Sequence, residues 1–230
     1  MYVPPGQSLL VDISTPELYT VIVEGTLIFE DKGLTFDANF LICMGGRVQI
    51  GTFEEPFTSK LVITMHGDKD NSKQLPEFGN KVWGFHHGAT LDMHGVPRKT
   101  WTLLSKTAKA GESQISLSEV VDWVAGEEIV IASSDFNHNH SESRTIKAVS
   151  SDKKTVTLEQ VLEFTHFSEV EKYGGKDFPM QCEVGLLTRN IVYRGHPSED
   201  SIRNKYGAHL MLHSAGTLLI NNNNNSYLKT

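Results

Sequence analysis

Histidine is the most versatile chemical group in this sequence, and 10 of the 230 residues are histidine. His209 and His213 are four residues apart, so on a strand they share a face and could ligate a divalent metal ion together. A structural role is the alternative, because apolar residues alternate with them and no third ligand lies near them in the sequence. The adjacent His86 and His87 point to opposite faces of a strand, so at most one can join a site. Apart from this metal ion, no cofactor is expected.

Acidic side chains indicate a second kind of chemistry, the binding or cleavage of a polysaccharide, because glycoside cleavage needs two carboxyl groups that flank the bond. Asp92 and His94 alternate onto the same side of one predicted strand. Arg189 is expected to approach them from a later strand, where its guanidinium can pair with a sugar carboxylate. We therefore predict Asp92, His94 and Arg189 as ligand contacts, and the catalytic residues of any enzyme stay unassigned.

Composition and absent motifs exclude several classes of function. The 21 basic residues are scattered among 28 acidic ones, which gives a net charge of −7 and disfavours nucleic acid as a partner. No G-x-S-x-G, H-E-x-x-H or phosphate-loop string occurs, so serine hydrolase, zinc protease and nucleotide-binding functions have no support. No apolar run approaches the ~20 residues of a membrane-spanning helix. Residues 1–10 show no signal peptide.

Glycine spacing predicts the architecture that must position these side chains. Gly25, Gly46, Gly67 and Gly88 follow one another at intervals of 21 residues. A short apolar stretch precedes each glycine, and a second, alternating stretch follows three of them. Chance is the alternative among 19 glycines, but the repeated strand context favours a true period. We therefore predict an all-β fold, a right-handed parallel β-helix with glycines at its corners, in which stacked repeats supply the core.

The pattern changes at Trp101, where alternating stretches joined by polar turns begin. Residues 143–149 and 154–158 read as a hairpin around a turn at 151–153. The order of short strand, glycine and short strand then returns in residues 183–195 and 207–220. This arrangement predicts a small antiparallel β-module inserted into the β-helix.

Longer strings carry a family resemblance. They are TPEL at 15–18, VEGTL at 23–27, IGTFEEPFT at 50–58, LDMHG at 91–95 and WVAGEEIVIAS at 123–133. Together they resemble the G-eight domain, which is named for eight glycines and is found in fibrocystin, fibrocystin-like receptors and the cell-migration-inducing and transmembrane hyaluronidases. The resemblance implies a G-eight domain over residues 7–133. Residues 134–220 would complete the β-module and return to the β-helix, and an asparagine-rich tail would occupy 221–230.

The resemblance also implies an extracellular or cell-surface location. Structural glycines would then be Gly25, Gly51, Gly88, Gly95, Gly126 and Gly185. Two N-x-S sequons make Asn139 and Asn224 candidates for N-glycosylation. The asparagine run and the missing export signal leave two interpretations open, a fragment of a longer protein or a mispredicted terminus. Whether Cys43 and Cys182 are free thiols or a disulfide stays open.

Two functions follow from these observations. The first is a noncatalytic recognition module of a fibrocystin-like receptor, which binds an extracellular glycan such as hyaluronan or a protein ligand. The alternative is part of a hyaluronan-binding and hyaluronan-degrading glycoside hydrolase. The acidic composition modestly favours the first, because it opposes a polyanionic substrate.

Overall fold

The computed structural model describes residues 1–86, 88–213 and 217–220, the last range as backbone. The chain divides into two compact units, which we call unit 1 (residues 1–97 with 190–230) and unit 2 (residues 98–189). The described residues are nearly all β-structure, with one short α-helix, α1 (Glu199–Asn204), and one 3-10 turn, η1 (His138–His140). No helix in the described ranges has the length and apolar character needed to cross a bilayer.

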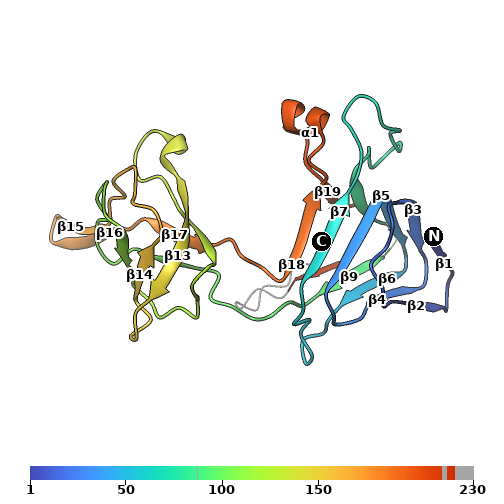
Figure 1. Cartoon of the computed structure of the whole chain (residues 1–230), viewed down its shortest axis with the longest axis horizontal. Helices are drawn as coiled ribbons and strands as arrows, with labels where there is room; N and C mark the ends of the chain where they lie inside the picture. Colours follow the sequence, from blue (N-terminus) through green and yellow to red (C-terminus); the bar gives the residue numbers. More distant parts are fainter. Residues whose placement is uncertain (87, 214–216, 221–230) are drawn as a thin grey trace. The chain divides into compact units, whose positions relative to one another are not determined.

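Unit 1 contains two sheets in which every strand pairing is parallel (Figure 1). The first sheet comprises β1 (Tyr2–Val3), β3 (Leu18–Val23), β5 (Leu34–Met44), β7 (Leu61–Met65), β8 (Val82–His86), β18 (Ile191–Gly195) and β19 (His209–Leu212). The second comprises β2 (Ser8–Val11), β4 (Thr26–Phe29), β6 (Arg47–Ile50), β9 (Thr90–Met93) and β20 (Thr217–Ile220). The first six strands of the chain therefore alternate between the two sheets.

Alternating apolar positions build the core of unit 1. Val21 and Val23 of β3, Leu27 and Phe29 of β4, and Val48 and Ile50 of β6 are buried in one cluster. The residues between them are more exposed, as the period of two in a strand requires. The apolar stretch predicted before Gly25 and the alternating stretches predicted after Gly25 and Gly46 are thus strands.

The predicted 21-residue period holds for one step only. Thr26 pairs with Arg47, but Arg47 pairs with Thr90, so the position equivalent to Gly25 and Gly46 is taken next by Ala89. The reason lies in β5, whose 11 residues are long enough to pair with both β7 and β8. The chain therefore forms an additional strand, β7, followed by a loop, between β6 and β8. Gly67 lies in this loop and does not occupy the position equivalent to Gly25 and Gly46.

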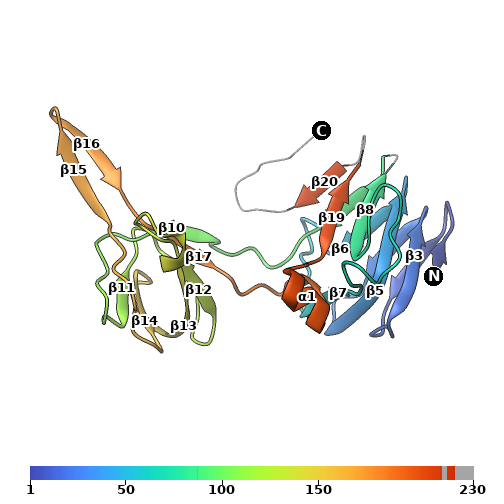
Figure 2. The same ribbon diagram turned by 90° about the horizontal axis from the view of Figure 1, so that it is seen from above.

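Unit 2 is an antiparallel half-barrel with its own core. Its sheet runs in the order β10 (Trp101–Leu103), β17 (Glu183–Leu186), β12 (Glu128–Ile131), β13 (Glu142–Val149), β14 (Thr155–Leu158) and β11 (Gln114–Ser116). The fully buried Trp123 lies in the core and donates from Nε1 to the carbonyl of Lys99 at 2.6 Å. The exposed hairpin of β15 (Glu169–Tyr173) and β16 (Lys176–Met180) extends from the rest of the unit (Figure 2).

The all-β class is confirmed, as are parallel strand pairing in unit 1 and an inserted antiparallel module. The hairpin predicted at 143–149 and 154–158 is the β13–β14 pair. The domain limits at 7–133 and 134–220 stay predictions, and the tail at 221–230 lies outside the described residues.

Candidate functional site

The predicted sugar contacts Asp92 and His94 lie at the end of β9 on the face opposite the core. The Asp92 residue is only 5% exposed, and its carboxylate accepts a charged hydrogen bond from Arg47 on the neighbouring strand β6. The other carboxylate oxygen lies 2.5 Å from His94 Nε2. Both oxygens of Asp92 are therefore engaged within unit 1, which suits a structural anchor better than a catalytic acid.

Arg47 is the arginine at Asp92 that sequence reasoning missed. The sequence carries no local signal for it, because Arg47 lies diagonally across from Asp92 only through the pairing of Arg47 with Thr90, which depends on strand register. The predicted partner Arg189 belongs to unit 2, where Arg98, Glu127 and Asp122 are its charged neighbours. Burial, together with the positive charge of Arg98, lowers the pKa of Arg189. The trio of Asp92, His94 and Arg189 stays a prediction.

His209 and His213, which the sequence predicts as a metal-binding pair, contact different partners in the structure. The ring of His209 packs edge-on against Tyr206, with the centroids 5.2 Å apart. His213 instead lies beside His86, at a centroid distance of 4.7 Å, and both approach the carboxylate of Glu77. These three side chains have ligand atoms within 4.8 Å of one another. The third ligand was hidden from the sequence because Glu77 lies in the loop between β7 and β8.

A histidine, a glutamate and a cysteine converge in the core of unit 2. His166 Nε2 lies 2.7 Å from Glu142 Oε1, and its Nδ1 lies 2.7 Å from the carbonyl oxygen of Ala132. Cys182 Sγ donates to the same carbonyl at 3.0 Å and lies 4.0 Å from His166 Nδ1. Burial raises the pKa of Cys182 to about 11, so the thiol stays protonated and is a poor nucleophile. The cluster is therefore structural.

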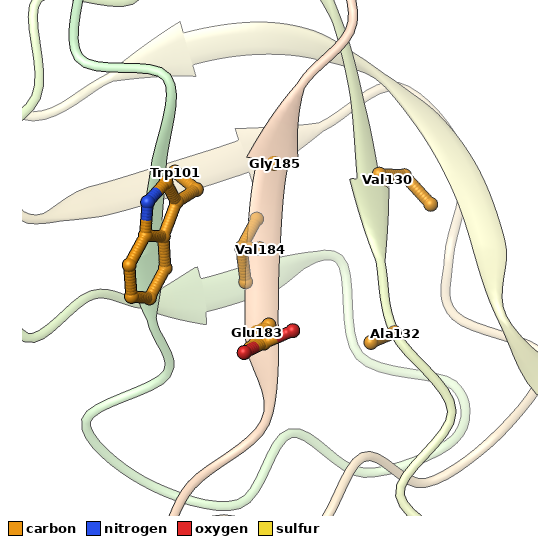
Figure 3. Close-up of a pocket in the computed structure, with 6 residues that line it drawn as sticks. All are labelled: Trp101, Val130, Ala132, Glu183, Val184 and Gly185. Atoms are coloured by element: carbon orange, nitrogen blue, oxygen red, sulfur yellow. The ribbon is translucent and has the colours of Figure 1, made fainter. Parts of the chain in front are cut away.

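A slot on the outer face of unit 2 lies beside an exposed aromatic side chain, Trp101. Trp101, Gly185 and Val130 are in register on the adjacent strands β10, β17 and β12. Because Gly185 has no side chain, a cavity of about 370 Å³ remains between the indole and Val130. Figure 3 shows β17 in the middle, with Trp101 on one side and Val130 on the other. The floor and end of the slot are formed by Ala132, Glu183 and Val184.

The chemistry of the slot is amphipathic. Trp101 is 49% exposed, so its indole offers an apolar face to a ligand. Glu183 is also exposed and provides carboxylate oxygens as hydrogen-bond acceptors. Sequence reasoning missed this site because the slot depends on the register of strands that are far apart in the sequence, such as the pairing of Trp101 with Gly185. Gly185 was singled out there only as a structural glycine.

The predicted glycines occupy positions of different kinds. At Gly25 a Cβ atom would lie 2.3 Å from the carbonyl oxygens of both Pro4 and Gln7, so a side chain is excluded. At Gly185 a Cβ would meet Val130 Cγ1 at 3.4 Å, a contact that a small side chain can accommodate. Of the other predicted positions, Gly51, Gly88 and Gly126 adopt positive φ, and Gly95 packs against Asn190.

The glycosylation candidate Asn139 is exposed within η1, between Asp135 and β13. Asn224 lies outside the described residues. Cys43 and Cys182 are free, buried thiols.

Comparison with known proteins gives a consistent picture. Residues 1–105 match the family profile described as G8 domain. The chain is 45% identical over 196 residues to Fibrocystin-L of Homo sapiens and 44% identical to Fibrocystin-L of Mus musculus, and each alignment covers 83% of this chain. It is 30% identical over 224 residues to a G8 domain-containing protein of Dictyostelium discoideum, which covers 93% of this chain. The chain spans 5% of each Fibrocystin-L and 14% of the Dictyostelium protein.

Proposed function

We propose that this chain, whose residues 1–105 are a G8 domain, is a noncatalytic recognition module of an extracellular or cell-surface, fibrocystin-like protein. Its ligand is a neutral glycan, bound in the Trp101 slot of unit 2. The observation that carries the proposal is the exposed indole beside a side-chain gap at Gly185, with a carboxylate at the end of the gap.

A sugar ring matches this slot in shape and in chemistry. The C–H face of a pyranose is apolar and packs on an indole, while its hydroxyl groups donate to a carboxylate such as Glu183. A neutral sugar is favoured over hyaluronan, because Glu183 and the net charge of −7 both oppose a polyanion. Hyaluronan and a protein ligand are therefore the two alternatives to a neutral glycan as the ligand of this chain.

The noncatalytic part of the proposal is supported by the buried acidic groups. Within the described residues these are Asp92, Glu127, Glu142 and Asp200, which pair with Arg47, Arg98, Arg144 and Arg203 respectively. A glycosidase needs one carboxylic acid whose pKa is raised so that it can donate a proton. The pKa of Glu142 is instead lowered: burial alone would raise it, but hydrogen bonds from the Glu163 amide and from His166 outweigh burial.

The two parallel sheets of unit 1 support a further part of the proposal, a right-handed parallel β-helix. Strands that alternate between two parallel sheets are expected of successive coils, and Gly25 and Gly46 would lie at stacked corners. A β-helix of this kind would present the outer faces of its sheets to solvent.

Binding of the full chain to an array of neutral and acidic glycans tests the function. We expect neutral glycans to bind, and Trp101→Ala and Gly185→Val to weaken binding about tenfold or more, which is about 1.4 kcal/mol. Tyr173→Ala, an exposed aromatic substitution on the β15 hairpin, is the matched control and should bind like the parent chain.

Size-defined hyaluronan forms a separate arm of the experiment. Shortening of hyaluronan that Asp92→Asn abolishes would establish the degrading enzyme and overturn the noncatalytic proposal. Glycan binding that is equal in Trp101→Ala and the parent chain would overturn the slot as the site.

A further inference from the structure

Three side chains from two segments that are far apart in the sequence meet at one end of the first sheet of unit 1. His86 is the last residue of β8, and His213 directly follows β19, which pairs with β8 in parallel (Figure 2). The pairing Phe85↔Leu212 and the hydrogen bond from the His213 amide to the Phe85 carbonyl at 2.9 Å place the two histidines side by side. Glu77 reaches them from the loop that precedes β8.

The separations within this cluster match the edges of a metal coordination shell. Glu77 Oε2 lies 3.4 Å from His86 Nε2 and 3.7 Å from His213 Nδ1. Both distances exceed the usual hydrogen-bond range of about 2.7–3.2 Å. In a tetrahedral zinc site with bonds of about 2.0–2.1 Å, neighbouring ligand atoms are about 3.3 Å apart. The two edges at Glu77 therefore fit a shared cation, and the ligand atoms of His86 and His213 lie within 4.8 Å of each other.

The surroundings orient the ligands and leave the site accessible. The side chain of His86 is 14% exposed, whereas those of Glu77 and His213 are 53% and 46% exposed. Phe78 packs edge-on against both imidazoles, at centroid distances of 6.3 and 6.1 Å, which restricts the rotation of the rings. His86 is thus held within the sheet. Glu77 and His213 lie at the surface, where an ion can reach them from solvent.

We infer that Glu77, His86 and His213 bind one divalent transition-metal ion, with Zn²⁺ as the favoured ion. Two imidazoles and one carboxylate are a ligand set of zinc sites that keep a fourth position open for water or a ligand. Calcium and magnesium prefer shells made of oxygen atoms, so a site with two nitrogen ligands discriminates against them. The bound ion would link the loop before β8 to the end of β19, two segments that are far apart in the sequence.

Isothermal titration of the tag-free full chain with zinc chloride, after dialysis against a chelator, tests this site. We expect one ion per chain, and at least about tenfold weaker binding in Glu77→Gln and His213→Ala, as loss of a ligand removes part of the shell. His209→Ala is the matched control, because this histidine lies on the same strand but packs against Tyr206. It should bind zinc like the parent chain.

A second measurement separates binding from folding. Zinc should raise the thermal unfolding midpoint of the parent chain and of His209→Ala, but not that of Glu77→Gln or His213→Ala. Both latter side chains are substantially exposed, so these variants should fold without metal. Absence of stoichiometric zinc binding to the parent chain, or equal affinity in all variants, would overturn the inference, as would calcium binding as tight as zinc.

Discussion

At the scale of single residues, charge in the core of unit 2 is neutralised locally. Glu142 accepts hydrogen bonds from the amides of Glu163 and Phe164, from His166 and from Arg144. Because these donors favour the ionised carboxylate, they outweigh the cost of burial and lower its pKa below 4.5. Such a network is strongly destabilised when one partner is removed, since the other charges stay buried.

The first prediction concerns this carboxylate. Glu142→Gln should lower the free energy of unfolding of unit 2 by about 3 kcal/mol near neutral pH, measured by urea denaturation. Because the folded pKa lies below the unfolded one, the stabilisation is present above about pH 4.5 and is lost as the pH falls through the folded pKa. The variant should lack this acid-dependent loss. Glu159→Gln, at an exposed glutamate of the same unit, is the control. Equal stability of both variants at all pH values would contradict the structure.

The second prediction concerns the two thiols. Burial raises the pKa of Cys43 to about 12 and that of Cys182 to about 11, so neither forms a thiolate at neutral pH. A thiol reagent such as dithiobis-nitrobenzoate should label neither in the folded chain and both in denaturant. Failure to label in denaturant without a reductant would mean that the two cysteines are oxidised.

At the scale of elements, the close approach of consecutive corners in unit 1 explains why glycine is needed at one position. The Cβ of an alanine at Gly25 would lie 2.3 Å from two carbonyl oxygens, and backbone atoms cannot move aside cheaply. Gly33, by contrast, has nothing within 4 Å of its Cβ direction.

The third prediction uses this contrast. Gly25→Ala should destabilise unit 1 by at least about 2 kcal/mol through overpacking, whereas Gly33→Ala should have little effect. Chemical denaturation of the two variants provides the comparison. Similar stability of both would mean that the corner at Gly25 is looser than its geometry indicates.

The elements also show how far sequence reasoning reaches. Alternating apolar residues predicted β3, β4, β6 and β9, because burial on one face is a local property. Pairing partners are not local: β5 is long enough to hold both β7 and β8, and this changes the register after Gly46. The sites follow the same rule. His213 was predicted as a ligand, but Glu77 and the Trp101 slot depend on register and loop path, which no short motif encodes.

At the scale of the whole molecule, the chain has a separate hydrophobic core in each unit. The large cluster of unit 1 includes Trp83, and that of unit 2 includes Trp123, with no residue in common. Units with their own cores are expected to fold independently.

The fourth prediction follows from these separate cores. Residues 98–189 alone should fold cooperatively, with the near-ultraviolet circular dichroism of a buried Trp123. Glu142→Gln should lower the unfolding midpoint of this unit in the full chain and leave the other transition in place. A single transition that shifts as a whole would show that the units fold as one.

The central claim is recognition of a neutral glycan in the Trp101 slot, and tryptophan fluorescence tests it most directly. Of the three tryptophans, Trp83 and Trp123 are fully buried and Trp101 is half exposed, so quenching by acrylamide reports mainly on Trp101. The account predicts that a neutral glycan which binds the full chain shields Trp101 from the quencher, and that Gly185→Val abolishes this shielding. A glycan that binds with unchanged quenching of Trp101 would contradict it.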